Sequence, residues 1–427
     1  MVTVFKNFNL IDGTKNCKLK TNQMIEITDS KITNLGTFKV KEGSKVIDLN
    51  GKYLLPGLIN MHAHLPASGK VNPNKKAADN KKLVKLICSN KLTRQIGILL
   101  SKKYAKMELF SGVTTVRTVG GVSNFDSIVR DKINKGKILG PRILTSNYAI
   151  GTPGGHMVGT VAVGASSVEE ALNLVDDLAQ SKVDLIKLMI TGGVLDSEEI
   201  GKPARLRMQP EMVKAVCDKA HKLGFKVAAH VESGEGIKVA IENGVDSIEH
   251  GADLDENLIE LLKQRHGSIC CTLSPAIPFV KLDPKETGYG EVGKENGTVV
   301  FNGIVECAKK CLEAGINVGL GNDCGSPFVT HYNFYKELDY FVRFCDVSKE
   351  FAIYSATLCN AKIAGIDNIT GSIEIGKDAD ILIVDCNPLD DLNNLSNPRI
   401  VITRGKIIHN PKNKKYPSVE ASLNKLN

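Results

Sequence analysis

Residues 221–250, HKLGFKVAAHVESGEGIKVAIENGVDSIEH, contain the same short pattern twice. In each copy a helical run reaches a glycine, Gly224 or Gly244, and a short apolar run follows. A histidine ends that run, His230 in the first copy and His250 in the second. Glycine suits the left-handed residue that closes a helix, because it has no Cβ and avoids the steric cost. Each copy therefore predicts a helix followed by a strand, the repeating unit of an α/β fold with a parallel sheet.

The pattern returns at residues 312–323, LEAGINVGLGND, where Gly315 follows the helix and Asp323 ends the apolar run. Short apolar runs alternate with helical periodicity over residues 58–366. Eight of these runs are candidate strands: GLINMHAHL, GVTTVRTV, RILTSNYAI, DLIKLMIT, KVAAHV, DSIEH, SICCTL and NVGLGND. Eight parallel strands with intervening helices over about 300 residues predict a (β/α)8 TIM barrel. The alternative is an open doubly wound sheet, which is disfavoured because no glycine-rich phosphate turn follows the first strand.

Two of the intervening helices carry further signals. Ser167 followed by Glu170 is the pattern of a capping box, which predicts the start of a helix. Another helix has an apolar stripe at helical spacing, expected to face the core. The stripe consists of Met212, Val213, Val216, Ala220 and Leu223.

The two chain ends have a different texture. The first fifty-odd residues alternate β-rich runs with turn signals, which predicts a small antiparallel sheet. Similar runs, GSIEIGKDADILIVD and IVITRGKIIHN, return near the other end. We expect residues 1–57 and 367–427 to form one composite β-sandwich domain, and residues 58–366 to form the catalytic barrel domain.

The composition excludes several classes of protein. Lys and Arg (55) exceed Asp and Glu (47), giving a net charge of +8, but the basic residues are mostly scattered, which disfavours nucleic-acid binding. No apolar stretch is long enough to span a bilayer, and the first residues lack the apolar region of a signal peptide. The eleven cysteines are an odd number without paired spacing, so we expect reduced thiols and a cytoplasmic protein without a membrane partner.

Polar side chains interrupt the apolar runs at a few places. In LLPGLINMHAHL (54–65) two histidines are separated by one residue, so on a strand they point to the same face. Alone, this pair fits metal ligands or hydrogen-bonded core histidines equally well. However, catalytic groups of a TIM barrel lie at the C-terminal ends of its strands, and buried polar groups are costly unless paired. The expected set is His62, His64, Lys187, His230, His250 and Asp323. Together these residues predict a metal site.

Lys187 is unusual because it lies inside an apolar strand, in DLIKLMITGG. Burial disfavours the charged ammonium, and a neutral amine can react with carbon dioxide to give a carbamate. A carbamate has two oxygens and can bridge two metal ions. The alternative is a lysine paired with Asp323 or another acid.

The combination of LPGLINMHAHL, GVTTVRTVGG, IKLMITGG, AAHVESGEG, DSIEHG and GLGNDCG resembles the amidohydrolase superfamily over almost the whole chain. The likeness is greatest to the branch of imidazolonepropionase-related enzymes and prolidase-like dipeptidases. The resemblance implies two divalent metal ions, with zinc expected. His62, His64 and Asp323 would hold the more buried ion, His230 and His250 the more exposed one, and carboxylated Lys187 would bridge them.

The resemblance also implies a reaction. Two such cations would make hydroxide available near neutral pH, and Asp323 would accept its proton and pass it to the departing nitrogen. We therefore expect a metal-dependent hydrolase that cleaves the amide bond of a small peptide or N-acyl amino acid, with dipeptidase or carboxypeptidase activity, Xaa-Pro dipeptidase activity included.

Loop residues are candidates for substrate contacts. His156 lies in GTPGGHMVG after the third strand, where relatives carry a comparable histidine near the substrate. Arg205 and Arg207 follow the fourth strand, and a guanidinium suits a substrate carboxylate. Tyr148 is a further substrate-binding candidate. Each of these residues also fits a role as an ordinary loop or surface group.

Arg117 and His331 lie at loop ends as well, and a purely structural role is the favoured interpretation for both. Thr118 follows Arg117, where relatives often have aspartate. Glu232 stands where dipeptidase-like relatives carry an aromatic residue or a second histidine. A carboxylate there would repel a substrate carboxylate unless a cationic group faces it.

Three alternatives remain at this stage. A single-metal enzyme that opens a cyclic amide, of the imidazolonepropionase type, is disfavoured by Lys187. A ring deaminase is disfavoured by Ser233, because related deaminases carry glutamate three residues after the histidine of the fifth strand. The third is a non-enzyme, either a barrel that binds metal only for stability or a binding protein with an inactive site. By likeness to relatives we also expect a homo-oligomer.

Overall fold

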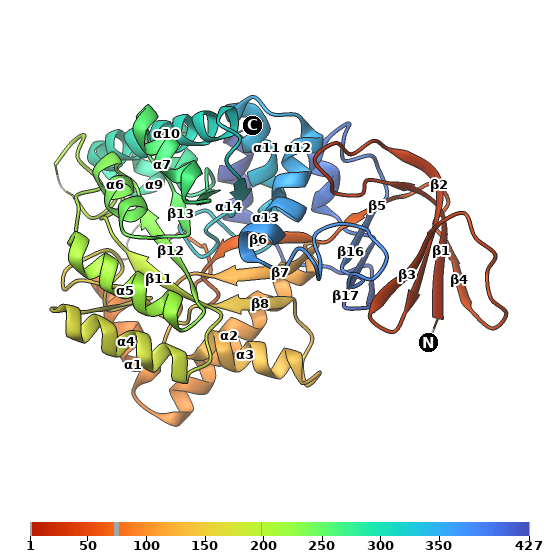
Figure 1. The fold of residues 1–427 in the computed structure, drawn as a ribbon, viewed down its shortest axis with the longest axis horizontal. Helices are drawn as coiled ribbons and strands as arrows, with labels where there is room; N and C mark the ends of the chain where they lie inside the picture. The colour runs from red at the N-terminus through yellow and green to blue at the C-terminus, as the bar shows by residue number, and fades with distance from the viewer. Residues whose placement is uncertain (1, 72–76, 198, 427) are drawn as a thin grey trace.

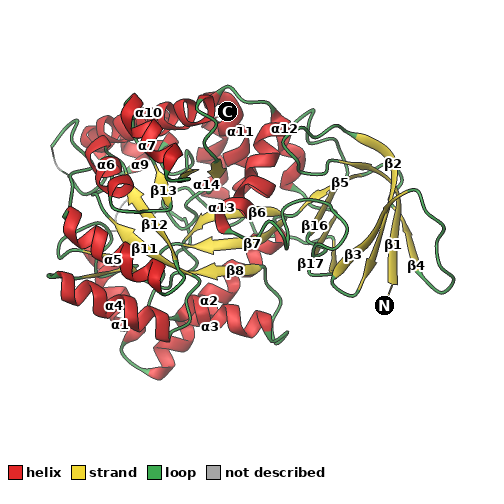
Figure 2. Ribbon diagram, viewed as in Figure 1, coloured by secondary structure: helices red, strands yellow, loops and turns green. Residues whose placement is uncertain are grey.

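The computed structural model describes residues 2–71, 77–197 and 199–426 of the chain. Most helices surround a central group of strands, and at one end of the molecule stand strands without such a helical cover (Figures 1 and 2). The protein therefore has the predicted α/β content.

Every predicted strand segment of the central region contains a strand. The strands are β6 (Leu58–Ala63), β7 (Val113–Thr118), β8 (Arg142–Thr145), β11 (Leu185–Met189), β12 (Lys226–Val231), β13 (Ser247–His250), β14 (Ser268–Cys271) and β15 (Val318–Leu320). The third predicted segment is divided, because a further strand, β9 (Ala149–Gly151), follows β8 after a short break.

The central strands pair in parallel and, apart from β10 at one edge, follow the order of the sequence. β6, β7 and β8 form one sheet, and the other sheet has the order β10-β9-β11-β12-β13-β14-β15, in which β10 is Ala162–Gly164. Backbone hydrogen bonds also join the two sheets. The N–H of Asp323 donates to the carbonyl of His62 at 2.9 Å, and the N–H of Asp184 donates to the carbonyl of Thr145 at 2.8 Å. Because paired strands are parallel, their C-terminal ends lie at the same edge of each sheet.

Helices lie in the connections between these strands. The longer ones are α1 (Ala77–Cys88), α2 (Lys91–Phe110), α3 (Phe125–Asn134), α4 (Val168–Gln180), α5 (Pro210–Lys222), α6 (Gly234–Glu242), α7 (Glu256–Gln264), α10 (Gly290–Glu313) and α11 (Phe334–Cys345). Shorter helices are α8 (Ile277–Lys281), α9 (Pro284–Thr287), α12 (Lys349–Tyr354), α13 (Asn360–Ala364) and α14 (Pro417–Leu423), and a π-helical segment covers Ser355–Cys359.

The predicted helix ends are confirmed. Gly224, Gly244 and Gly315 have φ of +84°, +97° and +75°, in the left-handed region that glycine adopts without strain. At the start of α4 the Ser167 side chain accepts a hydrogen bond from the N–H of Glu170. The carboxylate of Glu170 in turn accepts from the N–H of Ser166, one residue before the predicted partner.

One residue of the predicted apolar stripe of α5 is misplaced. Met212, Val213, Val216 and Ala220 are buried, but Leu223 is 47% exposed. The helix ends at Lys222, and Leu223 is already its C-cap residue. The helix therefore ends one residue before the last residue of the predicted stripe, and the side chain of Leu223 turns towards solvent.

Both chain ends contribute strands to a single eight-stranded sheet with the order β18-β17-β16-β5-β1-β2-β3, in which β4 also pairs with β1. Its strands are β1 (Val2–Leu10), β2 (Lys20–Thr28), β3 (Lys31–Gly36), β4 (Lys45–Asp48), β5 (Tyr53–Pro56), β16 (Ile381–Val384), β17 (Ile400–Thr403) and β18 (Lys406–His409). The expectation of an antiparallel sheet was wrong in part, since β1 pairs in parallel with both β4 and β5. The hydrogen bonds define one mixed sheet and do not show the expected sandwich.

Strand β16 packs on both of its faces. Leu382 and Val384 belong to the large core of the central region, whereas Ile381 and Ile383 belong to a second core built from the end sheet. A strand that is buried on both faces reads as a continuous apolar run, which explains the sequence ILIV. Among the described residues, no helix combines the length and the apolar character needed to cross a membrane.

All eleven cysteines are free. Eight are buried, as expected for small apolar residues, but Cys17 and Cys88 are half-buried and Cys386 is exposed.

Candidate metal centre

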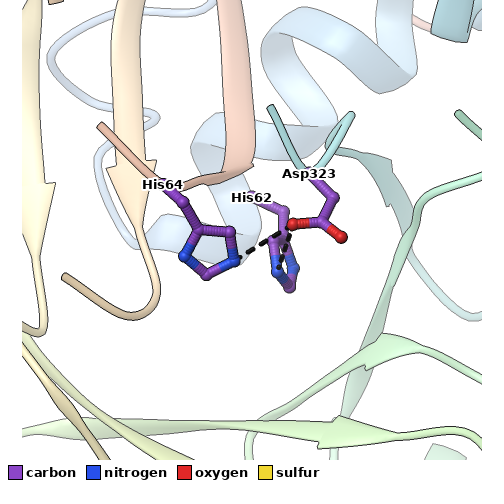
Figure 3. A group of neighbouring side chains, drawn as sticks. All are labelled: His62, His64 and Asp323. Atoms are coloured by element: carbon purple, nitrogen blue, oxygen red, sulfur yellow. Dashed lines mark ion pairs between the residues drawn. The ribbon is translucent and has the colours of Figure 1, made fainter. Parts of the chain in front are cut away.

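Three predicted ligands meet at the C-terminal edge of the strands. His62 and His64 extend from β6, and Asp323 follows β15, which brings residues 259 or more positions apart into contact (Figure 3). The Nε2 atom of His64 lies 3.0 Å from Oδ1 of Asp323, and Nε2 of His62 lies 3.6 Å from the same oxygen. The predicted convergence of the two histidines is therefore observed. Both imidazoles aim Nε2 at one carboxylate.

The second nitrogen of each ring is occupied elsewhere. Nδ1 of His62 lies 2.9 Å from Oε2 of Glu249, and Nδ1 of His64 lies 2.7 Å from the carbonyl oxygen of Gly120. A partner of this kind fixes the tautomer with the hydrogen on Nδ1, so that the Nε2 lone pair is free for a metal. The hydrogen bonds thus orient both rings as ligands.

Glu249 belongs to a buried network that the sequence did not reveal. Its Oε1 accepts hydrogen bonds from Arg117 at 2.6 Å and from the Ser247 hydroxyl at 2.9 Å. Arg117 also donates to the carbonyl of Met61 at 2.8 Å. Arg117 therefore fixes the carboxylate that orients His62. The available signal was the acid directly before His250, in DSIEHG.

A second group of possible ligands consists of His230, His250 and Glu232. His230 is the next-to-last residue of β12, and His250 is the last residue of β13. One possible ligand atom from each lies within 4.8 Å of the others. The ring centroid of His250 lies 4.7 Å from that of His62 and 4.7 Å from that of His230. Nδ1 of His250 is hydrogen-bonded to Thr272 Oγ1 at 2.6 Å. His250 therefore connects the two groups of ligands. Sequence reasoning had placed Glu232 near the site but had not counted it among the ligands.

Lys187 lies on β11 with no exposed surface. Its Nζ has no hydrogen-bond partner among the residues described. Burial lowers the pKa of Lys187 to about 8, although the carboxylate of Glu249 acts in the opposite direction and Arg117 adds to the lowering. The amine is thus unusually easy to deprotonate, and the alternative of a lysine in an ion pair is not observed.

The ionisation states suit a cation. Burial and the charge of Lys187 place the pKa of His62 well below its usual value, and burial does the same for His230 and His250. Burial alone would raise the pKa of Asp323, but His62 and His64 hold it below its usual value. Burial alone would lower the pKa of His64, but the hydrogen bond and charge of Asp323 raise it above its usual value. The site therefore offers three neutral imidazoles and an ionised carboxylate, the forms that bind metals such as zinc.

Two of the candidate ligands also have a strained backbone. His250 and Asp323 have φ of +69° and +54°, which non-glycine residues seldom adopt. Each such residue costs about 1–3 kcal/mol. Both side chains belong to the candidate metal centre, which we define as His62, His64, Lys187, His230, His250 and Asp323.

His156 lies against this centre. Its ring stacks on that of His230 with centroids 4.1 Å apart and an interplanar angle of 7°. Its Nδ1 is paired closely with the carboxylate of Asp196. Burial alone raises the pKa of Asp196, but His156, the N–H of Gly193 and the charge of Arg207 together lower it. His156 and Arg207 therefore belong to one polar group beside His230.

Arg205 and Tyr148 lie differently. Arg205 is exposed and forms an ion pair with Glu199. It lines a cavity of about 630 Å³ that also touches Glu232. Tyr148 is half-buried, and burial together with the charge of Asp177 on α4 raises its pKa to about 12. The cavity thus touches Glu232, which neighbours His230 and His250, whereas Tyr148 lies towards a helix.

The comparisons with known proteins agree with this geometry. A family model described as "Amidohydrolase family" matches residues 53–408. Among solved structures, a putative prolidase from Bifidobacterium longum has a TM-score of 0.87 and 33% identity, covering 100% of this chain and 98% of that one. A Xaa-Pro dipeptidase with bound methionine in the active site has a TM-score of 0.83 and 29% identity, with 96% and 100% coverage.

Two further proteins are similar to this chain in sequence. Ochratoxinase from Aspergillus niger is 26% identical over 324 residues, which make up 69% of this chain but only 64% of that enzyme. Imidazolonepropionase from Kosmotoga olearia is 22% identical over 404 residues, 88% of this chain and 87% of the relative. The predicted likeness to imidazolonepropionase-related and prolidase-like proteins is confirmed. With most of its length matched by the family model, the chain belongs to the amidohydrolase family.

Proposed function

We propose that this amidohydrolase binds two divalent metal ions and hydrolyses the amide bond of a small peptide or N-acyl amino acid. The observation that carries the proposal is Lys187, a buried amine without a hydrogen-bond partner among the described side chains, on a strand between those that supply the histidines. A carbamate on this amine would give a negative group with two oxygens, able to join a His62, His64 and Asp323 site to a His230 and His250 site.

The fold proposed for this function is a closed (β/α)8 barrel. The support comes from the eight parallel strands in sequence order and from the hydrogen bonds at both seams between the two sheets. We place the barrel domain at residues 58–366 and a composite end domain at residues 1–57 and 367–427. The shared C-terminal edge of the strands then becomes the barrel mouth, where active sites of this fold lie.

The chemistry divides between the ions and the chain. When bound, a pair of divalent ions lowers the pKa of water towards neutrality and polarises a carbonyl oxygen. Asp323, ionised and held by Ser326 Oγ at 2.9 Å, would accept the proton of the attacking water and deliver it to the leaving nitrogen. His156, beside His230, would donate a hydrogen bond to the substrate carbonyl or carboxylate.

The cavity beside Glu232 is the proposed place for the rest of the substrate. Its volume of about 630 Å³ suits a dipeptide-sized molecule. Oε2 of Glu232 is buried and accepts no hydrogen bond from the described residues, so a substrate ammonium would give it a partner. Arg205, at the same cavity, can meet a carboxylate, with Arg207 and Tyr148 as further candidate contacts. These features favour a dipeptide with free ends, such as an Xaa-Pro dipeptide, over an N-acyl amino acid.

The test combines metal analysis with a substrate panel. The full chain reconstituted with zinc should hold two metal equivalents at this centre and hydrolyse members of a panel of dipeptides and N-acetyl amino acids. Lys187→Ala should lose metal and activity, whereas Lys219→Ala, a lysine paired with Asp176 on the helical surface, should lose neither. No hydrolysis of either class by metal-loaded protein would reject the peptidase version.

The alternatives predict other results. Hydrolysis of a cyclic amide with one metal equivalent, unchanged in Lys187→Ala, would favour the imidazolonepropionase type. A ring deaminase lacks support, because Ser233 caps α6 by accepting from the N–H of Gly236 and so has a structural task. A homo-oligomer in the cytoplasm remains our prediction, to be checked by light scattering and cell fractionation.

A further inference from the structure

A second cluster of metal-ligating side chains lies next to the candidate metal centre but shares none of its residues. Glu108 of α2 and Cys324 and His331 of the segment after β15 are all buried, and one ligand atom from each lies within 4.8 Å of the others. Sγ of Cys324 lies 2.9 Å from Oε1 of Glu108. The three residues thus combine a thiol, a carboxyl group and an imidazole in one small volume.

This cluster is incompletely satisfied. Among the residues that the structure describes, Oε2 of Glu108 and both ring nitrogens of His331 are buried without a hydrogen bond. The backbone of His64 lies beside the imidazole of His331. A bound water or ion would satisfy these polar atoms.

Neighbouring side chains contact the members of this cluster. The side chain of Tyr104, one turn before Glu108 on α2, stacks on the His331 ring with centroids 4.6 Å apart. The amide of Asn60 donates towards Oε1 of Glu108 at 3.4 Å and towards Sγ of Cys324 at 3.8 Å. The shorter hydrogen bond of this amide goes to Oδ1 of Asn322, at 2.8 Å. A neighbouring carbonyl at an imidazole is also a common means of orienting a histidine ligand.

We propose that Glu108, Cys324 and His331 bind a structural zinc ion, separate from the candidate metal centre. Thiolate, imidazole and carboxylate are all zinc ligands, at about 2.0–2.3 Å from the ion, and atoms within 4.8 Å of one another can share one ion at that distance. The unpaired Oε2 of Glu108 supplies a fourth donor, as the closed coordination of structural sites requires. The charges balance, because one thiolate and one carboxylate neutralise a divalent ion.

The site has a structural consequence. Cys324 and His331 are the first and last residues of the segment that begins directly after Asp323. Glu108 belongs to a helix that covers the strands. An ion shared by all three would tie both ends of this segment to α2. It would thereby hold the strained backbone of Asp323 in place without contacting substrate.

The test uses sulfur as the marker, because the candidate metal centre contains no sulfur ligand. Zinc X-ray absorption of the wild-type full chain should show zinc–sulfur scattering. Total zinc should be one equivalent more than the candidate metal centre holds. After replacement by cobalt(II), the protein should show thiolate-to-cobalt charge-transfer absorption, which should disappear in Cys324→Ser and in Glu108→Gln with the loss of one equivalent.

Two controls separate this site from the proposed function. Cys359→Ser removes another buried thiol, which contacts the Val318 carbonyl, and should retain the absorption band. Lys187→Ala should also retain it, even if that variant is inactive. Absence of sulfur scattering in the wild type, or a band that persists in Cys324→Ser, would overturn the zinc proposal and leave the amidohydrolase proposal unaffected.

Discussion

At the scale of single residues, the candidate metal centre depends on side chains outside its set of candidate ligands. Arg117, Glu249 and Ser247 form a buried chain of hydrogen bonds that ends at Nδ1 of His62. A charged pair without exposed surface is costly to assemble, and removing one partner leaves the other unpaired. The network therefore couples the stability of the fold to the orientation of one ligand.

Replacing Arg117 tests this coupling. Arg117→Leu should lower the free energy of unfolding by about 3–5 kcal/mol, because it leaves Glu249 buried without its cation. Zinc affinity should fall by about 10–100-fold, since Glu249, which orients His62, is no longer held by Arg117. Urea unfolding and competition with a chelator measure the two effects. Lys214→Leu, which removes an exposed pair with Asp218, should cost less than about 1 kcal/mol.

The lowered pKa of Lys187 predicts a pH dependence of assembly. With a pKa of about 8, roughly a tenth of the amine is neutral at pH 7 and about nine tenths at pH 9. Only the neutral amine reacts with carbon dioxide. Reactivation of metal-free protein by zinc, at a fixed concentration of dissolved carbon dioxide, should therefore speed up as the pH rises from 7 to 9 and level off above that. A rate independent of carbon dioxide would contradict a carbamate on Lys187, and Lys187→Arg should not reactivate.

At the scale of elements, the sequence contains strong local signals for where some helices begin and end. Ser167 and Glu170 cap α4, and Gly224 follows α5 with a positive φ. These contacts involve neighbours in the chain, so they follow from sequence alone. Leu223 departs from its stripe for an equally local reason, because the helix ends before it.

The N-cap of α4 gives a prediction about the free energy of unfolding. Ser167→Ala removes the acceptor for the N–H of Glu170 and should lower the free energy of unfolding by about 1 kcal/mol. Ser181→Ala, at the other end of α4, should change it by less than about 0.5 kcal/mol, because backbone groups make the contacts there. Chemical denaturation measures both changes. Equal losses of stability in the two variants would show that Ser167 does not act as an N-cap.

At the scale of the whole molecule, the end sheet is joined to the central region through β16. Leu382 is fully buried and packs close to Gly112, where an added Cβ would lie only 2.9 Å from its side chain. The apolar side chains of one strand thus contribute to two cores at once. The second chain end is for this reason an integral part of the fold.

Leu382→Ala tests that connection. Truncating a fully buried leucine should lower the free energy of unfolding by about 2–5 kcal/mol, through lost burial and the cavity left behind. Ile375→Ala, at a site 62% exposed, should change it by less than about 0.5 kcal/mol. Equal effects for the two variants would show that β16 does not hold the sheet to the central region.

The amino-acid sequence alone determined the α/β class, the eight strand segments, the helix-ending glycines and six candidate ligands, because periodicity and strand-end positions are local properties. Only the tertiary structure revealed Glu249 and Arg117 behind His62, the cluster of Glu108 and His331 with Cys324, and the mixed pairing of the end sheet. Those contacts join residues from distant segments, and the geometry of packing decides which buried groups meet. For Tyr148 and Arg205, whose surroundings are set by loops, the sequence offered candidates but no position.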